Sequence, residues 1–229
     1  MQASLAPWAL WLCAGMILSG CSSQPQVSPA PNRVETTLVS HTLSIDPGEP
    51  RVLTSPQRTI RITEQKLQRV TEFDAQNQQI ASHDNFLSLP WANQTLTVIA
   101  EGQRFPLRTD QDGMVRLNLL HEQFVELDFE QLRGIELVAR SATSTVAETD
   151  LLISRELRTV LREAVPLIYN SLEEDDVTQW VQRVRQLTSL GLSEESTQLE
   201  NMLILLTVGD PELQFQFIQA LQQDHSEGP

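Results

Sequence analysis

The stretch TLTVIAEGQRFPLRTDQDGMVRLNL, residues Thr95–Leu119, carries the clearest structural pattern in the chain. Apolar side chains occupy every second position over 96–100 and again over 115–119, which is the period of a strand with one buried face. The segment Asp110–Gly113 between these runs has the Asp and Gly residues that favour a tight turn. We therefore predict two strands that form a hairpin around this turn.

The same alternation recurs through residues 34–150. Turn residues such as Pro47-Gly48 and Arg133-Gly134 interrupt it about every ten positions, a spacing that is typical of antiparallel β-sandwiches. We predict a β-sandwich domain over 34–150. The apolar positions that define its strands are Ile60, Ile62, Leu96, Val98, Ala100, Val115, Leu117, Leu119, Val125, Leu127, Phe129, Ile135, Leu137 and Ala139.

The segment Thr95–Leu119 also resembles a recurring hairpin of transthyretin-like and carboxypeptidase-regulatory-like sandwiches. In that hairpin a strand ends in a Thr-Asp-x-x-Gly turn, here Thr109–Gly113, and returns as an alternating strand. The resemblance covers some 25 residues. It implies a β-sandwich and implies nothing about activity.

The period changes to that of a helix after Thr149, so we predict a helical domain over 151–224 and a tail over 225–229. Pro166 is expected to kink or interrupt the first helix, Gly191 to end the second, and Asp210-Pro211 to start the fourth. The fold class is therefore α+β, an antiparallel β-sandwich followed by a small C-terminal helical bundle. The helical stripes consist of Leu157, Val160, Leu161, Val165, Ile168 and Leu172, then Val177, Trp180, Val181, Val184 and Leu187, and finally Leu213, Phe217, Ile218 and Leu221.

The N-terminal segment has an apolar run over 5–18 that ends in Leu18-Ser19-Gly20-Cys21. This run is shorter than the roughly 20 residues of a membrane span and suits the core of a secretory signal. An aliphatic residue, two small residues and a cysteine resemble the signal of bacterial lipoprotein precursors. The resemblance implies a signal peptide over 1–20, recognition of Leu18, Ser19 and Gly20 by the signal peptidase, and lipidation of Cys21.

One feature departs from that signal. The first basic residue of the chain is Arg33, whereas signal peptides usually have Lys or Arg before the apolar core. Either the start is misassigned or the segment is an unusual but functional signal. The alternative to a lipoprotein signal is an uncleaved apolar N-terminus with a chance cysteine.

The lipoprotein resemblance has further implications for location. A diacylglyceryl group and acyl chains on Cys21 would bind the membrane, and Ser22 after the cysteine favours the outer membrane over retention in the inner one. Residues 21–33 comprise the predicted lipidated cysteine and a Ser/Pro-rich tether, in which the 11 residues 22–32 are expected to extend over roughly 35 Å. The folded part would then face the periplasm.

The net charge and the cysteine content argue against two classes of function, nucleic-acid binding and thiol chemistry. The chain has 30 acidic and 16 basic residues and a formal net charge of −14, which argues against nucleic-acid binding because phosphate contacts require clustered Lys and Arg. The two cysteines are Cys13, inside the predicted signal, and Cys21. The mature chain would therefore have no disulfide and no thiol chemistry.

Candidate catalytic and metal-binding residues are few. Asp110–Gly113 has the opening spacing of a calcium loop, but the later ligands are missing, and a turn explains the same residues. The histidines His41, His83, His121 and His225 do not have metal-ligand spacing. The sequence contains no Gly-x-Ser-x-Gly, Ser-x-x-Lys or His-Glu-x-x-His motif, so we expect no enzymatic activity, no cofactor and no metal.

Apolar residues in the helical region suggest a partner surface. The segment Met202–Val208 is apolar almost all round, which fits either a helix buried by its neighbours or a face that docks a protein. Trp91 and Trp180 likewise fit either the core or a ligand platform. The candidate partner face comprises Trp180, Met202, Leu203 and Leu206.

The sequence thus predicts a non-catalytic binding or scaffolding lipoprotein of an envelope assembly, with an envelope protein as its partner. One alternative is a carrier that holds a small or lipidic ligand between sandwich and bundle. A second alternative is a cell-envelope hydrolase that uses His83 or His121.

Overall fold

The computed structural model describes residues 31–173 and 176–223. The predicted signal peptide, Cys21 and most of the predicted tether lie outside the described residues. No helix in the described part is both long enough and apolar enough to cross a membrane.

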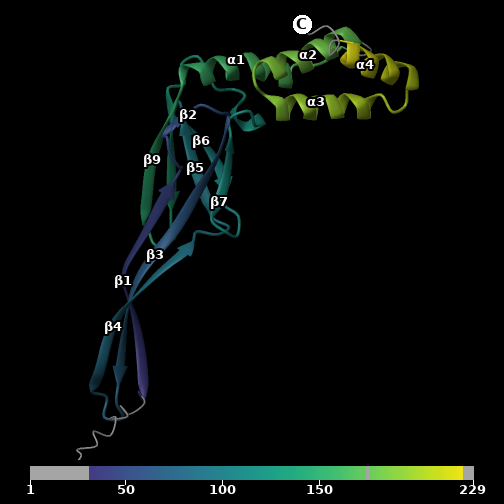
Figure 1. The fold of residues 1–229 in the computed structure, drawn as a ribbon. Helices are drawn as coiled ribbons and strands as arrows, with labels where there is room; N and C mark the ends of the chain where they lie inside the picture. The colour runs from purple at the N-terminus through teal and green to yellow at the C-terminus, as the bar shows by residue number, and fades with distance from the viewer. Residues whose placement is uncertain (1–30, 174–175, 224–229) are drawn as a thin grey trace, which may run out of the picture.

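The protein has an α+β fold in which two mostly antiparallel sheets precede four helices, as predicted (Figure 1). In the first sheet β3 lies centrally, with β1 along one side and both β4 and β7 along the other. The second sheet has the order β2-β9-β8-β5-β6, and its β2–β9 pair is parallel. The strands are β1 (Arg33–Asp46), β2 (Val52–Leu53), β3 (Gln57–Phe73), β4 (Gln79–Pro90), β5 (Thr95–Ala100), β6 (Gln103–Arg108), β7 (Met114–Asn118), β8 (Gly134–Arg140) and β9 (Val146–Ile153).

The alternating positions of the sequence form the core between the sheets. Leu96, Val98 and Leu117 have no solvent exposure. Phe105 packs against Phe124 of the short 3-10 helix η1 (Glu122–Phe124), with ring centroids 4.7 Å apart. Apolar side chains at every second position place one face of each strand in this core.

The turn at Asp110–Gly113 forms as predicted, but the predicted hairpin is wrong. Its two flanking strands enter different sheets, because β6 pairs with β5 and β7 pairs with β3. The turn is held against the segment that follows β4: the Thr109 hydroxyl donates to the Trp91 carbonyl at 2.6 Å, and the Asn93 amide donates to the Asp110 carbonyl at 3.1 Å. These contacts direct the chain across the sandwich.

The backbone of Ile62 is the point where β3 changes partner. Its amide donates to the Gly113 carbonyl at 2.8 Å, and its carbonyl accepts from the Trp91 amide at 3.1 Å. On one side of Ile62 the neighbour of β3 is β7, and on the other side it is β4. Gly113 has a φ of +71°, and a Cβ there would lie 2.5 Å from the Ile62 carbonyl oxygen.

We predict that Gly113→Ala destabilises the protein by about 3–5 kcal/mol. The cost of an alanine in the left-handed backbone region adds to the cost of the overlap between its Cβ and the Ile62 carbonyl oxygen. The matched control is Gly102→Ala, at a φ of +76° with no atom within 4 Å of the added Cβ. This control is expected to cost only about 1–2 kcal/mol. Urea unfolding measures both variants, and equal losses would contradict the proposed role of Gly113.

Beyond the sandwich, β1, β3 and β4 continue as a three-stranded arm, visible at the bottom of Figure 1. We define the arm as residues 33–40, 67–73 and 79–86, which are paired through Ser40–Leu67–Phe86 at one end and Arg33–Phe73 at the other. Arg69 and Asp84 form a bidentate ion pair across this arm. Arg69 donates through Nε to Oδ1 of Asp84 at 2.8 Å and through Nη2 to Oδ2 at 3.1 Å. The Arg33 guanidinium lies 4.5 Å from the centroid of the Phe73 ring at the tip.

The helices follow β9 directly, and together with the sheets they share one hydrophobic core. They are α1 (Arg155–Tyr169), α2 (Val177–Ser189), α3 (Ser193–Leu206) and α4 (Pro211–Gln223). The Ser154 hydroxyl caps α1 by accepting from the Leu157 amide at 3.1 Å, and Asp210 caps α4 as predicted. Helix α1 continues through Pro166 to Tyr169, so the predicted interruption at Pro166 does not occur.

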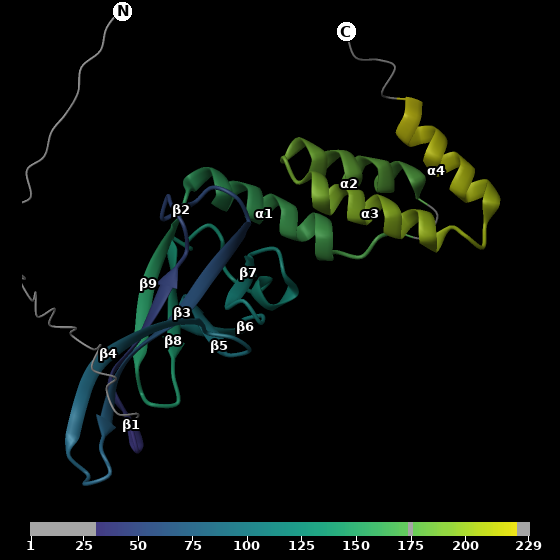
Figure 2. The same ribbon diagram turned by 60° about the horizontal axis from the view of Figure 1, so that its bottom comes forward.

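Helix α2 lies between α3 and α4 and packs against both (Figure 2). Trp180 of α2 meets Phe217 of α4 edge to face, with ring centroids 5.7 Å apart. Gly191 adopts a φ of +77° just after α2, as expected for a residue that ends a helix. The helical part is thus a small bundle built around α2.

Candidate functional site

An exposed apolar surface of the helical bundle lies on α3, while Val208 after α3 and Phe215 and Ile218 of α4 are further exposed apolar residues. Met202, Leu205 and Leu206, which we call the α3 stripe, are 47%, 71% and 69% exposed. Their spacing of three and four residues places them on one face of the helix. Met202 also lines a small cavity of about 200 Å³ together with Ile168 and Leu187.

Two members of the predicted partner face lie elsewhere. Trp180 and Leu203 are buried in the core of the bundle, with 5% and 0% exposure, so their assignment to a partner face is wrong. The physical reason is that α2 packs against both α3 and α4, which covers Trp180 and the inner side of α3. Of the predicted face, Met202 and Leu206 are exposed, and Leu205, which lies within the predicted apolar segment Met202–Val208 but was not assigned to the face, is exposed as well.

A cavity of about 390 Å³ with a mixed polar and apolar lining lies between the sandwich and α3. Arg116 of β7 binds Glu194 of α3 at 3.1 Å, and the Tyr169 hydroxyl donates to the Leu120 carbonyl at 2.7 Å. His121 lines this cavity and caps η1 by accepting from the Gln123 amide.

His41 lies at the base of the arm, in a cluster that joins three segments. Its Nε2 is 2.7 Å from a Glu64 carboxylate oxygen, and its Nδ1 is 2.8 Å from the Thr143 hydroxyl of the β8–β9 loop. Lys66 binds the same carboxylate at 2.9 Å. A carboxylate, an imidazole and a hydroxyl in this order have the connectivity of a catalytic triad, but here they connect β1 and β3 to the tip of the β8–β9 hairpin. We assign the cluster a structural role.

Glu64 makes this cluster sensitive to acid. Partial burial raises the pKa of its carboxyl, but the ammonium of Lys66 and the imidazole of His41 outweigh that effect and hold the pKa below the ordinary value of 4.5. A lowered pKa in the folded state stabilises the protein above the unfolded-state pKa, and this contribution is lost as the pH falls through the folded-state pKa.

We therefore predict that Glu64→Gln lowers the free energy of unfolding at pH 7. The difference in free energy of unfolding between the variant and the unsubstituted protein is expected to shrink below pH 4.5. Urea unfolding at a series of pH values measures this difference. Glu72→Gln on the same strand is the control, because no ion pair to Glu72 is found among the described residues. If Glu64→Gln lowers the free energy of unfolding by the same amount at every pH, the stabilising role of the ionised Glu64 carboxylate is disproved.

The remaining candidate residues from the sequence are His83, His225 and the segment Asp110–Gly113. His83 is exposed on β4, and His225 lies outside the described residues. Asp110 uses its Oδ1 to accept from the amides of Asp112 and Met114, both at 2.9 Å, so the carboxylate stabilises the turn. In the described part of the chain, no group of three or more His, Cys, Asp or Glu side chains is arranged to hold a metal ion.

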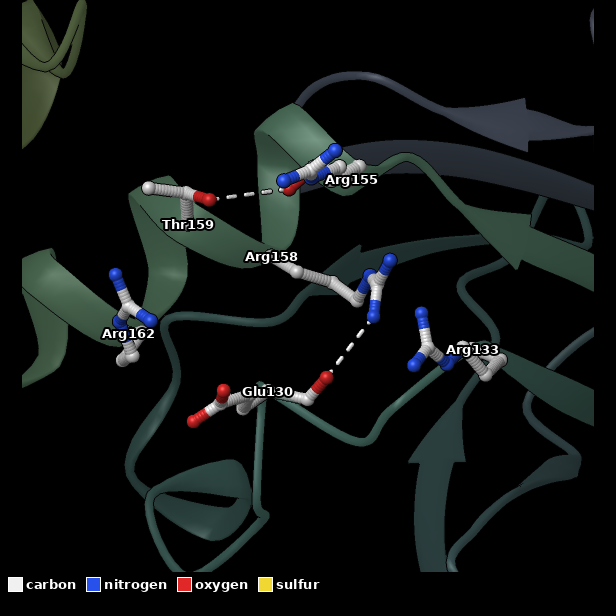
Figure 3. Close-up of a pocket in the computed structure, with 6 residues that line it drawn as sticks. All are labelled: Glu130, Arg133, Arg155, Arg158, Thr159 and Arg162. Atoms are coloured by element: carbon white, nitrogen blue, oxygen red, sulfur yellow. Dashed lines mark hydrogen bonds between the residues drawn. The ribbon is translucent and has the colours of Figure 1, made fainter.

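A basic pocket of about 490 Å³ lies where α1 meets the loop before β8 (Figure 3). Its lining residues are Glu130, Arg133, Arg155, Arg158, Thr159 and Arg162. Arg158 donates through Nη1 to the backbone carbonyl of Glu130 at 2.9 Å. We call this site the arginine pocket.

The arginine pocket was not predicted from the sequence, although part of its signal is present there. Arg155, Arg158 and Arg162 are three and four residues apart within a predicted helix, which places them on one face. Arg133 comes from a loop that only the tertiary fold brings to α1.

Comparisons with protein-family models, with curated proteins and with solved structures found no match to this chain.

Proposed function

We propose that this protein is a non-catalytic scaffolding lipoprotein, anchored in the outer membrane through acyl chains on Cys21 and facing the periplasm. Its helical bundle would dock an envelope protein. The observation that supports this proposal best is the separation of the two ends: β1 begins at Arg33 at the tip of the arm, and the bundle lies at the opposite end of the molecule (Figure 1).

The arm is suited to work as a spacer. At about 3.4 Å per residue, the part of β1 within the arm, residues 33–40, spans roughly 27 Å. A Ser/Pro-rich tether of about 11 residues adds up to roughly 35 Å. A chain anchored at Cys21 would therefore carry its bundle well clear of the lipid headgroups.

The α3 stripe is the surface of the bundle that best fits a protein partner. Large exposed aliphatic side chains beside a small cavity supply the apolar centre of a docking site, and here Leu205 and Leu206 are more than two-thirds exposed. Glu194, Glu195 and Gln198 lie one to two turns earlier on the same helix and provide a polar rim.

The anchor is tested by producing the full chain and a Cys21→Ser variant in a Gram-negative host. We expect the unsubstituted chain in the outer-membrane fraction, released only by detergent, because two or more acyl chains hold a protein stably in a bilayer. The Cys21→Ser variant is expected to lose that attachment. An unmodified Cys21 in mass spectrometry of the membrane-bound protein would contradict the proposal.

The docking face is tested by site-specific photocrosslinking in cells that encode the chain naturally. We expect a discrete crosslinked protein from Leu206, and we expect Leu205→Glu in the same chain to reduce its yield by about tenfold, because a buried unpaired charge opposes docking. Thr197, which is exposed on another face of α3, is the matched control position. Equal crosslinking from Leu206 and Thr197 would argue against this face.

A further inference from the structure

The arginine pocket gathers positive charge in a chain that is strongly acidic overall. Four of the 16 basic residues line it, together with a single acidic residue. From this arrangement we infer that the arginine pocket binds a small oxyanion that bears at least two adjacent phosphate or carboxylate groups. The inference does not depend on the lipid anchor or on the α3 stripe.

The guanidinium groups of Arg133 and Arg158 lie close together in the pocket, and those of Arg155 and Arg162 lie farther along its wall (Figure 3). Arg155, Arg158 and Arg162 project from one face of α1, and Arg133 approaches from the loop that precedes β8 (Figure 3). The close-up shows the guanidinium groups of Arg133 and Arg158 next to each other with no carboxylate between them. Like charges at this distance repel each other, and a bound anion would relieve that repulsion.

The hydrogen-bonding capacity of these arginines is largely unused within the described residues. Arg158 donates to the Glu130 carbonyl through Nη1, but its buried Nε has no partner. Arg162 forms an ion pair with Glu163 at 3.6 Å, whereas no ion pair to Arg133 or Arg155 is found in the described part of the chain. The Glu130 carboxylate likewise forms no ion pair there and points away from Arg158 (Figure 3).

The nature of the ligand follows from the donors and from the size of the pocket. Each guanidinium can bind two oxygens of a phosphate or a carboxylate in a fork. A single oxyanion engages one or two such forks, so four arginines match a ligand with two or more adjacent anionic groups. A volume of about 490 Å³ is within the range of small-molecule sites. The first turn of α1 adds the positive end of a helix dipole.

The test uses isothermal titration of the purified full chain at low ionic strength with pyrophosphate, citrate and orthophosphate as probes. We expect pyrophosphate or citrate to bind at one site with a Kd below about 1 mM, and orthophosphate to bind at least tenfold more weakly. Tighter binding of pyrophosphate than of citrate would assign the site to phosphate ligands, and the reverse order would assign it to carboxylates. Orthophosphate that binds as tightly as both would overturn the requirement for two groups.

The arginines are tested by the substitutions Arg133→Gln and Arg162→Gln, which change exposed side chains. Each is expected to weaken binding by about tenfold, because a charge-assisted hydrogen bond is lost. Arg61→Gln, an exposed arginine of β3, is the charge-matched control and is expected to leave the affinity unchanged. Circular dichroism establishes that the three variants remain folded.

Two outcomes would overturn the inference. The first is the absence of saturable binding of all three probes at low ionic strength. The second is equal weakening by Arg61→Gln and by the two pocket variants, which would show that the net charge of the surface attracts the anion rather than the arginine pocket.

Discussion

The backbone of Ile62 is the constraint on which the architecture depends. The Ile62 amide donates to the Gly113 carbonyl and its carbonyl accepts from the Trp91 amide, at the point where the neighbour of β3 changes from β7 to β4. The single 17-residue strand β3 can therefore belong to both the sandwich and the arm. The first half of β3 covers the sandwich core, and the second half forms the centre of the arm. On its other edge β3 pairs with β1 from Arg33–Phe73 to Asp46–Arg61, so these two strands run through both the arm and the sandwich.

A second set of contacts fixes the bundle on the sandwich. Tyr169 bonds to Leu120, Arg158 bonds to Glu130, and Arg116 bonds to Glu194. These contacts are polar and are distributed from the start of α1 to the start of α3. They supplement the shared apolar core.

Much of the fold could be predicted from local pattern. Alternating apolar residues located several of the sandwich strands, and the cap at Asp210 located the start of α4, because both signals act within a few residues. The alternating run over 125–129 was misleading, because those residues follow η1 in turns rather than a strand. The turn at Asp110–Gly113 was also predictable. Its strands do not pair with each other because the destination of β7 depends on Trp91 and Ile62, which lie far away in the sequence. The arginine pocket required the same kind of long-range information, since Arg133 and α1 meet only in the folded chain.

The direction of β1 has a mechanical consequence. Its first residue lies at the tip of the arm, and its partner β3 runs antiparallel to it from Arg33–Phe73 to Asp46–Arg61. Tension between a membrane anchor and a bound bundle would act along the strands. The hydrogen bonds between β1 and β3 would then all bear the force at the same time, in shear. Strands that are pulled apart from one end would instead break their bonds one after another. A slender, largely solvent-exposed arm can therefore carry load without a core of its own.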